Sequence, residues 1–260
     1  MSAPLLKADG LCKSYAGVHA VAEVSFSLVE GTITAMIGPN GSGKSTTVDL
    51  VTGFQAADAG MVSLDGRALT GLAPEQIARS GLMRTFQQVR VYDTLAIEEN
   101  LLTAAQETDG TGWLDALLRS RRFRAADSAA RARAAELLDL VGLARMAQAP
   151  AGVLSYGQKK LVALAGALMP RPRLVILDEP VAGVNPTRVL EVEAIIRRLH
   201  QAGQSFLIIE HNVDFVMRLS QRVIVLDQGR KIADGTPEEV RANEAVLEAY
   251  LGTEAEPADA

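Results

Sequence analysis

The sequence predicts an α/β fold with a parallel core sheet. Residues 174–177 and 206–209 are continuous apolar runs, the composition of strands that are covered on both faces. Residues 189–199, which lie between these runs, carry apolar side chains at helical spacing. A third apolar run, residues 33–37, leads through a glycine-rich segment into a helical pattern that starts at Ser45. Strands that alternate with helices in this way are typical of parallel sheets.

The other segments predict further strands and a helical middle. Residues 24–28 alternate apolar and serine side chains, as a half-buried strand does, and residues 61–64 predict a strand that leads into a turn. Residues 95–149 are rich in Ala, Leu, Arg and Glu and predict helices. Residues 223–226 predict another strand, and Thr236 is expected to cap a short helix that has proline at its first position. We therefore expect a helical insertion between two stretches of parallel sheet.

Length and composition exclude several classes of protein. The chain has 260 residues, of which 48% are apolar and 22% charged, as in an ordered globular protein. Its longest apolar stretch, residues 161–169, is far shorter than the roughly 20 residues of a membrane-spanning helix. No secretory signal is visible, and the single Cys12 fits a reducing cytosol. A net charge of −5, from 26 basic and 31 acidic residues, argues against a general nucleic-acid binder.

A glycine-rich motif between a predicted strand and a predicted helix indicates a phosphate-binding loop. The motif consists of Gly38, Pro39, Asn40, Gly41, Ser42, Gly43, Lys44, Ser45 and Thr46, and it fits G-x-x-x-x-G-K-[ST] in full. Its glycines allow backbone N–H groups to surround phosphate oxygens at the start of a helix, whose dipole also favours anions. We expect Lys44 to reach the β- and γ-phosphates and the Ser45 hydroxyl to bind Mg²⁺.

Two acidic residues follow the apolar run 174–177. In a nucleotide site the first acid, here Asp178, holds Mg²⁺ directly or through water. The second acid, Glu179, is placed to orient or deprotonate an attacking water molecule. Together with the glycine loop, these acids predict a Mg²⁺-dependent nucleoside triphosphatase.

The segment Leu154-Ser155-Tyr156-Gly157-Gln158 opens the predicted helix that runs to Met169. Ser155 and Gly157 at a helix N-terminus can form a second anion-binding element. The same residues are equally consistent with ordinary helix capping.

With these motifs in this order, residues 5–252 resemble the ATP-binding subunit of an ATP-binding-cassette (ABC) transporter. The resemblance implies a single ATPase domain with a parallel core sheet, an antiparallel β subdomain and a helical subdomain over about residues 88–165. Residues 253–260 are expected to form an acidic, disordered tail.

The resemblance also assigns roles to residues that the motifs alone leave unassigned. Gln87, with Gln88 as the adjacent alternative, matches the glutamine that contacts the metal ion and the attacking water. His211 matches the histidine that contacts the γ-phosphate, and Tyr15 matches the aromatic residue that stacks on adenine. Segment 154–158 matches the signature loop, of which Ser155, Gly157 and Gln158 bind nucleotide. Asn185 ends the loop that crosses to the other subunit, where the family often has Asp.

In that family two subunits face head to tail, so that each ATP lies between the glycine loop of one and the signature loop of the other. The implied partners are a second cassette and two transmembrane permeases. The resemblance also implies that the subunit itself lies at the cytoplasmic face of the inner or plasma membrane, as a peripheral protein. Segments 84–87, 179–186, 210–213 and 249–252, together with the insertion around 108–124, resemble the longer ATPase subunit of branched-chain amino acid importers. That subunit pairs with a shorter paralogue and works with a solute-binding protein.

Three functions remain open at this stage. The first is the motor of an importer of branched-chain amino acids or related small solutes, such as urea, short amides and aromatic acids. The second is the motor of a lipid or lipopolysaccharide exporter, which should pair with itself. The third is a soluble cassette ATPase, for example in iron–sulfur assembly, with no membrane partner.

Overall fold

The computed structural model describes residues 3–105 and 120–253. The insertion around 108–124 therefore lies largely outside the described residues, and so does the acidic tail from Glu254 onward. The chain divides into two compact units. The first unit is made of Met1–Arg84, Arg173–Pro180 and Arg197–Ala260, and the second of Thr85–Pro172 and Val181–Ile196.

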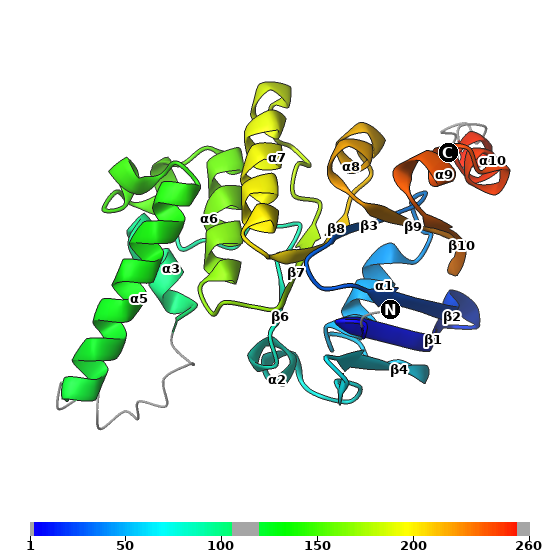
Figure 1. Cartoon of the computed structure of the whole chain (residues 1–260), viewed down its shortest axis with the longest axis horizontal. Helices are drawn as coiled ribbons and strands as arrows, with labels where there is room; N and C mark the ends of the chain where they lie inside the picture. Colours follow the sequence, from blue (N-terminus) through cyan, green and yellow to red (C-terminus); the bar gives the residue numbers. More distant parts are fainter. Residues whose placement is uncertain (1–2, 106–119, 254–260) are drawn as a thin grey trace. The chain divides into compact units, whose positions relative to one another are not determined.

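A six-stranded sheet forms the centre of the first unit (Figure 1). Its strands, in spatial order, are β10 (Arg230–Gly235), β9 (Arg222–Asp227), β3 (Ile33–Ile37), β8 (Ser205–Ile209), β7 (Leu174–Asp178) and β6 (Leu82–Arg84). All neighbours pair in parallel except β10 and β9, which are antiparallel. Every residue of β3, β7 and β8 is buried, as their continuous apolar sequences predict. The predicted parallel stretches on either side of the helical insertion thus belong to one sheet.

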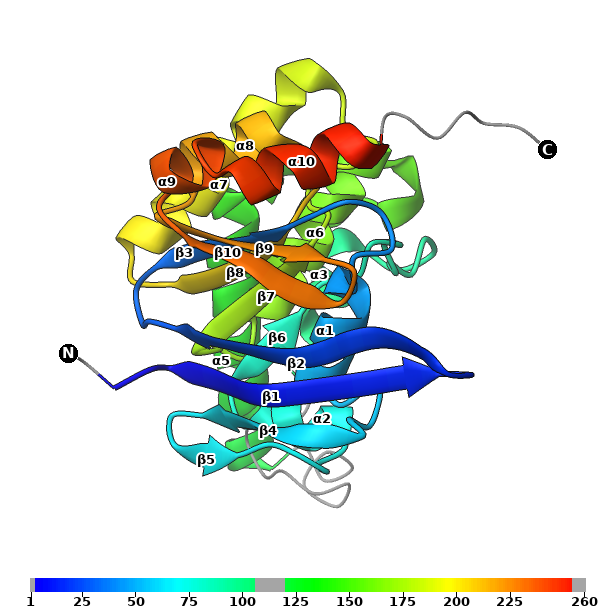
Figure 2. The same cartoon turned by 90° about the vertical axis from the view of Figure 1, so that its right-hand side faces the viewer.

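A second, antiparallel sheet belongs to the same unit (Figure 2). Its order is β2 (Val18–Leu28), β1 (Leu6–Tyr15), β4 (Ala59–Leu64) and β5 (Arg67–Ala68). Val24, Phe26 and Leu28 of β2 are buried whereas the serines between them are half-buried, which confirms the predicted alternation.

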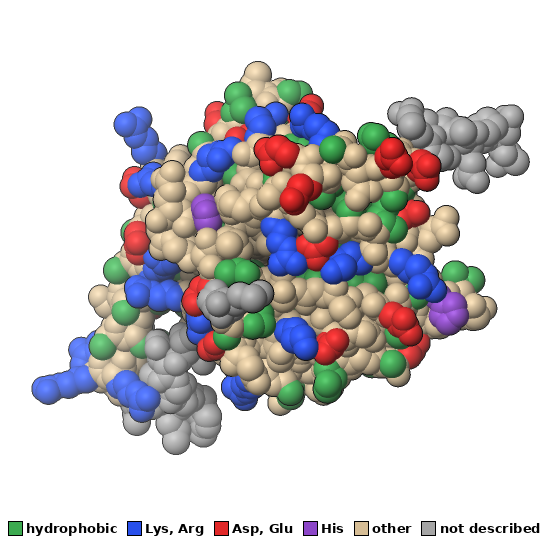
Figure 3. Space-filling view, turned by 45° about the vertical axis from the view of Figure 1, so that its right-hand side comes forward, with side chains coloured by type: hydrophobic (Ala, Val, Ile, Leu, Met, Phe, Trp, Pro, Cys, Tyr) green, Lys and Arg blue, Asp and Glu red, His purple; other side chains and the backbone are tan. Residues whose placement is uncertain are grey.

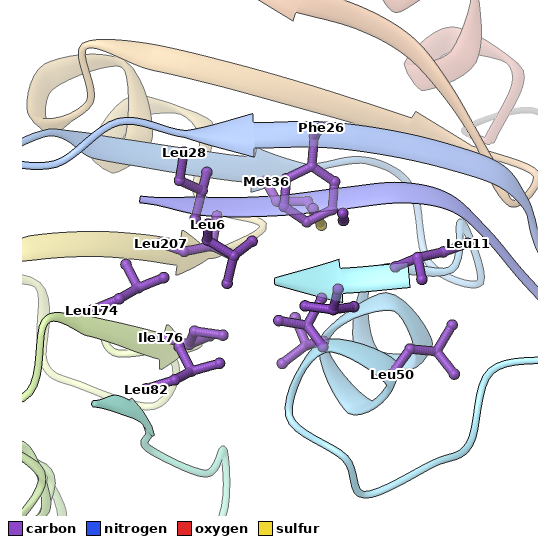
Figure 4. Close-up of a cluster of buried hydrophobic side chains, with 14 of the residues drawn as sticks. Leu6, Leu11, Phe26, Leu28, Met36, Leu50, Leu82, Leu174, Ile176 and Leu207 are labelled. Atoms are coloured by element: carbon purple, nitrogen blue, oxygen red, sulfur yellow. The ribbon is translucent and has the colours of Figure 1, made fainter. Parts of the chain in front are cut away.

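Helix α1 (Lys44–Val51) packs between the two sheets (Figures 1 and 4). Its Val48, Leu50 and Val51 join one apolar cluster with side chains from both sheets, among them Phe26 and Ile176. Burial of each such side chain contributes roughly 1.5–3 kcal/mol to stability. This core therefore holds α1, the helix that follows the glycine loop, against β3 and β7.

The remaining helices of the first unit are short. They are α2 (Pro74–Arg79), α8 (Val213–Leu219), α9 (Pro237–Arg241) and α10 (Glu244–Thr253). Thr236 caps α9 in a reciprocal capping box with Glu239, and Pro237 is the first helical residue, as predicted. Helix α7 (Pro186–Gln201) begins in the second unit and ends in the first.

The second unit is helical. It contains α3 (Ile97–Thr103), α5 (Arg121–Leu140) and α6 (Tyr156–Leu168), which pack on one another, with two short 3₁₀ turns at Ala144–Met146 and Ala151–Val153. Ile97, Leu101, Leu137, Leu138 and Leu161 are among its buried side chains. Over residues 3–105 and 120–253, no helix combines the length and the apolar character needed to cross a membrane.

Candidate active site

The glycine loop joins the end of β3 to the start of α1, as the sequence predicts. Gly38 is buried, and a Cβ atom there would lie 2.0 Å from the backbone oxygen of Leu226. Gly43 adopts a φ of +96°, and a Cβ atom there would lie 2.4 Å from the backbone oxygen of Ala20. Because neighbouring backbone leaves no room for a side chain, both positions require glycine, Gly38 against β9 of the six-stranded sheet and Gly43 against β2 of the antiparallel sheet.

Lys44 lies inside this loop. Its Nζ donates to the backbone oxygens of Gly38 and Pro39, both at 2.8 Å, and to Ser42 Oγ at 3.3 Å. Burial lowers the pKa of Lys44, while the negative charge of Glu179 raises it in part. Asn40, Gly41 and Ser45 are exposed and Thr46 is half-buried. The loop therefore presents a partly desolvated cation together with accessible polar groups, an arrangement suited to phosphate.

Asp178 is the last residue of β7, and only 10% of its side chain is exposed. Its Oδ2 accepts a hydrogen bond from Arg84 Nη2 at 2.7 Å. Arg84 Nη1 lies 2.5 Å from Oδ1 of Asp49 on α1. We assigned no role to Arg84 or Asp49 from the sequence, because they lie 94 and 129 residues away from Asp178 along the chain.

Glu179 turns away from the strand that precedes it. Its φ is +49°, in the left-handed region that side chains other than glycine seldom adopt, and its backbone N–H donates to Ile209 of β8 at 2.8 Å. Such strain costs about 1–3 kcal/mol and is frequent where a side chain must be aimed at a reacting group. The carboxylate is 26% exposed and lies 3.9 Å from Nδ1 of His211.

His211 follows β8 in a turn that is organised by Glu210. The Glu210 side chain is fully buried, and its Oε2 accepts the backbone N–H groups of His211 at 3.0 Å and Asn212 at 3.1 Å. Asn212 in turn caps α8 through a bond from Phe215 N–H. The sequence offered one signal for Glu210, an acid directly after a buried strand, but we gave it no separate role.

Tyr15 ends β1 at a hairpin in which it pairs with Val18. Its side chain is 45% exposed, and Lys13 Nζ lies 5.6 Å from the ring centroid. An exposed ring at a strand end can stack on a base.

The other predicted site residues belong to the second unit. Ser155 is the N-cap of α6, where its Oγ accepts the Gln158 N–H at 3.4 Å and its own N–H donates to Gln158 Oε1 at 3.0 Å. Gly157 follows within the first turn of the helix. The capping interpretation of this segment is therefore confirmed, whereas its nucleotide contact stays a prediction.

Gln87 and Gln88 are exposed in the segment that follows β6. The Tyr156 hydroxyl donates to the backbone oxygen of Gln87 at 3.2 Å. The Tyr156 ring also borders Gly183, where an added Cβ atom would lie 3.3 Å from a ring carbon. Tyr156 thus connects the glutamine segment with the loop that ends at Asn185, a contact that the sequence did not predict.

A glycine loop between a strand and a helix of a parallel sheet, with two acids at the end of another parallel strand, defines a nucleoside triphosphatase of the phosphate-loop class. Comparison with known proteins identifies the family within this class. Residues 21–182 match the family model described as "ABC transporter", and residues 230–256 match one described as "Branched-chain amino acid ATP-binding cassette transporter". The chain belongs to the family of ABC transporter ATP-binding proteins.

The similarity to known proteins extends over almost the whole chain. The high-affinity branched-chain amino acid transport ATP-binding protein LivG of Salmonella typhimurium is 42% identical over 97% of this chain and 99% of its own length. The corresponding protein BraF of Pseudomonas aeruginosa is 40% identical with the same coverage.

Among solved structures, a nucleotide-free ABC-transporter cassette matches with a TM-score of 0.82 and 32% identity, over 95% of this chain and 99% of its own. A cassette in its ADP conformation matches with a TM-score of 0.83 and 31% identity, over 96% and 100%. These matches confirm the predicted fold class. The protein is therefore an ATP-binding, ATP-hydrolysing transport subunit, and this membership implies membrane permease partners.

Proposed function

We propose that this chain is the ATPase motor of an importer of branched-chain amino acids or related small polar solutes. The observation that carries the proposal is that almost the whole chain, and separately its C-terminal segment, match one transporter branch. The cassette matches LivG and BraF over 97% of this chain, and its last strand and helices match a C-terminal model of branched-chain transporters.

The geometry supports a division of catalytic roles in the first unit. Glu179 is the general base, since its carboxylate is accessible, aimed by a strained backbone and close to His211. Lys44 and His211 stabilise charge on the γ-phosphate, and the backbone of residues 38–46 binds the other phosphate oxygens. Tyr15 stacks on adenine.

The donor set fits Mg²⁺ that is bound together with nucleotide. Within residues 3–105 and 120–253, no group of three or more His, Cys, Asp or Glu side chains could hold a metal ion by itself. Mg²⁺ is typically held by one or two protein oxygens, water and substrate phosphates. Ser45 and Asp178 would supply such oxygens, and the family resemblance adds Gln87 as a third ligand. When bound, the ion would neutralise charge that develops on the phosphates.

The proposed assembly contains two cassettes, two transmembrane permeases and, indirectly, a solute-binding protein. The second cassette is a shorter paralogue in a head-to-tail heterodimer, so that Ser155, Gly157 and Gln158 bind the nucleotide held by the partner's glycine loop. We place the chain at the cytoplasmic face of the membrane. Acidic and basic side chains are intermingled on the face shown in Figure 3, which fits docking to protein partners better than binding to a polyanion.

Copurification tests the assembly. Tagged Glu179→Gln protein is purified from detergent-solubilised membranes with ATP and Mg²⁺, and all accompanying chains are identified by mass spectrometry. Recovery of two multi-span permeases and a shorter ATPase is the expected result. Lys44→Ala is the matched control, since it should reduce ATP-dependent pairing of the cassettes. Recovery of the chain only with itself favours the exporter, and recovery only with soluble proteins favours the non-transport ATPase.

Uptake measurements test the solute. The purified complex is reconstituted into vesicles with ATP inside, and uptake of leucine, isoleucine and valine is compared with that of urea and aromatic acids in the presence of the solute-binding protein. The proposal predicts ATP-dependent uptake of branched-chain amino acids. Uptake of urea or aromatic acids alone would contradict that specificity while leaving the ATPase role intact.

A further inference from the structure

Arg84 links two parts of the active site through a buried cation. It is the last residue of β6, at the edge of the six-stranded sheet, and only 9% of its side chain is exposed. One arm of the guanidinium reaches Asp178 Oδ2 at 2.7 Å, and the other reaches Asp49 Oδ1 at 2.5 Å. The second arm also lies 3.4 Å from Thr52 Oγ1.

The two carboxylates that Arg84 contacts belong to two different elements of the candidate site. Asp49 lies on α1, the helix that begins in the glycine loop, whereas Asp178 ends β7 beside Glu179. A planar guanidinium can hold two carboxylates in a defined geometry, which a lysine ammonium cannot reproduce. The Arg84 guanidinium therefore couples the position of α1, which begins in the glycine loop, to that of Asp178 at the end of β7.

Arg84 is also the ion-pair partner of Asp178, and both side chains are almost completely buried. Removal of one partner from a buried ion pair leaves an uncompensated charge, which is strongly unfavourable. The ring of Phe54 borders the guanidinium, with 5.8 Å from the ring centroid to Cζ, and limits its access to water. The pairing is thus partly desolvated and directional rather than an ordinary surface contact.

We propose that Arg84 is a positioning residue for Mg²⁺ binding, which holds the Asp178 carboxylate in the orientation needed for the ion that accompanies ATP. The inference rests on the proposed role of Asp178. It adds that a residue of β6 determines the geometry of the metal ligand. Arg84 lies directly before Thr85, where the chain passes from the first unit into the second.

Equilibrium binding of ATP, with Mg²⁺ and with EDTA, tests the role of Arg84 without any measurement of turnover. Arg84→Met keeps similar length and removes the charge. We expect the Mg²⁺-dependent gain in ATP affinity to fall by about 10- to 100-fold, the usual cost of losing a group that orients a metal ligand. Affinity in EDTA should stay near the wild-type value, because Lys44 and the glycine loop are retained. Asp49→Asn is the matched control and should lower the Mg²⁺ gain less, since the Arg84–Asp178 contact remains.

Each other outcome has a definite meaning. An unchanged or increased Mg²⁺ gain in folded Arg84→Met protein, with folding checked by circular dichroism, would overturn the inference. If Arg84→Met does not fold, Arg84→Lys takes its place, since it keeps the charge but not the fork, and a wild-type Mg²⁺ gain would again overturn it. Asp178→Asn distinguishes the failure of this inference from the failure of the proposed metal site.

If Asp178→Asn loses the Mg²⁺-dependent gain in ATP affinity but the Arg84 variants keep it, only the role of Arg84 is refuted. If Asp178→Asn also keeps the gain, the proposed metal site itself is refuted.

Discussion

The two predicted phosphate-binding elements, the glycine loop at residues 38–46 and the signature segment at residues 154–158, differ in how they are built. In the glycine loop, backbone atoms of Leu226 and Ala20, which lie outside the loop, exclude side chains at Gly38 and Gly43. In the signature segment, Ser155 and Gln158 satisfy each other in a capping box while Ser155 stays exposed.

This difference bears on what each element can do alone. The glycine loop has a partly desolvated lysine, and Glu179 lies close enough to raise the pKa of that lysine. The signature segment is an exposed helix start whose local hydrogen bonds are already made. It is therefore suited to bind a nucleotide that is already held by the glycine loop of the partner subunit. We therefore expect the loop to bind ATP in the isolated subunit and the signature segment to act only in the assembled pair.

The largest effect expected from a single substitution is on turnover. Glu179→Gln keeps the size of the side chain but removes the base, so ATP hydrolysis by the assembled transporter should fall by about 10²- to 10⁴-fold. ATP affinity should be retained. Phosphate release and equilibrium binding are measured side by side, with exposed Glu75→Gln as the control. Hydrolysis at the wild-type rate would exclude Glu179 as the base.

A comparison of two glycines tests whether the loop is held by its surroundings. Gly43→Ala and Gly41→Ala both place alanine at positive φ, a cost of about 1–2 kcal/mol in stability. Gly43→Ala should cost roughly 1–3 kcal/mol more, since its Cβ atom would meet the Ala20 backbone, whereas Gly41 has open space. Urea unfolding of both variants measures the difference. Equal losses would show that the Ala20 backbone does not constrain the loop.

A smaller effect is expected at Tyr15. Tyr15→Ala removes the proposed stacking on adenine, which should weaken ATP binding by about 1–3 kcal/mol. Binding of inorganic triphosphate, which has no base, should change little. The two ligands are compared by equilibrium titration, and an equal loss for both would refute the stacking.

The smallest effect is a pH dependence of ATP binding. Burial lowers the pKa of Lys44 in the free protein, although the charge of Glu179 opposes the shift. Because phosphate binding favours the protonated lysine, affinity should fall as pH rises through this lowered pKa, thus at a lower pH than for an ordinary lysine. Titrations from neutral to alkaline pH measure the decline, with Lys44→Arg as the control that stays charged. An identical pH profile in both proteins would contradict the assignment.

The parts of the site that could be predicted from the sequence are those that a short segment determines. The glycine loop, the two acids at the end of β7 and the Thr236 and Ser155 caps depend on neighbours within a few residues. Strand β1 was harder to predict, because its pairing with β2 shifts register between Ala8 and Leu11 and again near Lys13, which disrupts simple alternation.

Contacts between distant segments were not predictable in this way. Arg84 reaches Asp178 only because β6 and β7 pair in parallel, and Tyr156 reaches Gln87 across 69 residues of chain. Neither contact leaves a periodic or local pattern in the sequence. They appear only when the sheet order and the helix packing are known.

ATP affinity of the isolated subunit, compared between Lys44→Ala and Ser155→Ala, tests most directly whether the two elements serve different nucleotides. We predict that Lys44→Ala weakens binding strongly and that Ser155→Ala leaves it unchanged, although Ser155→Ala lowers hydrolysis once the full transporter is assembled. If Ser155→Ala weakens ATP binding by the isolated subunit as much as Lys44→Ala does, both elements bind the same nucleotide, and the head-to-tail arrangement is contradicted.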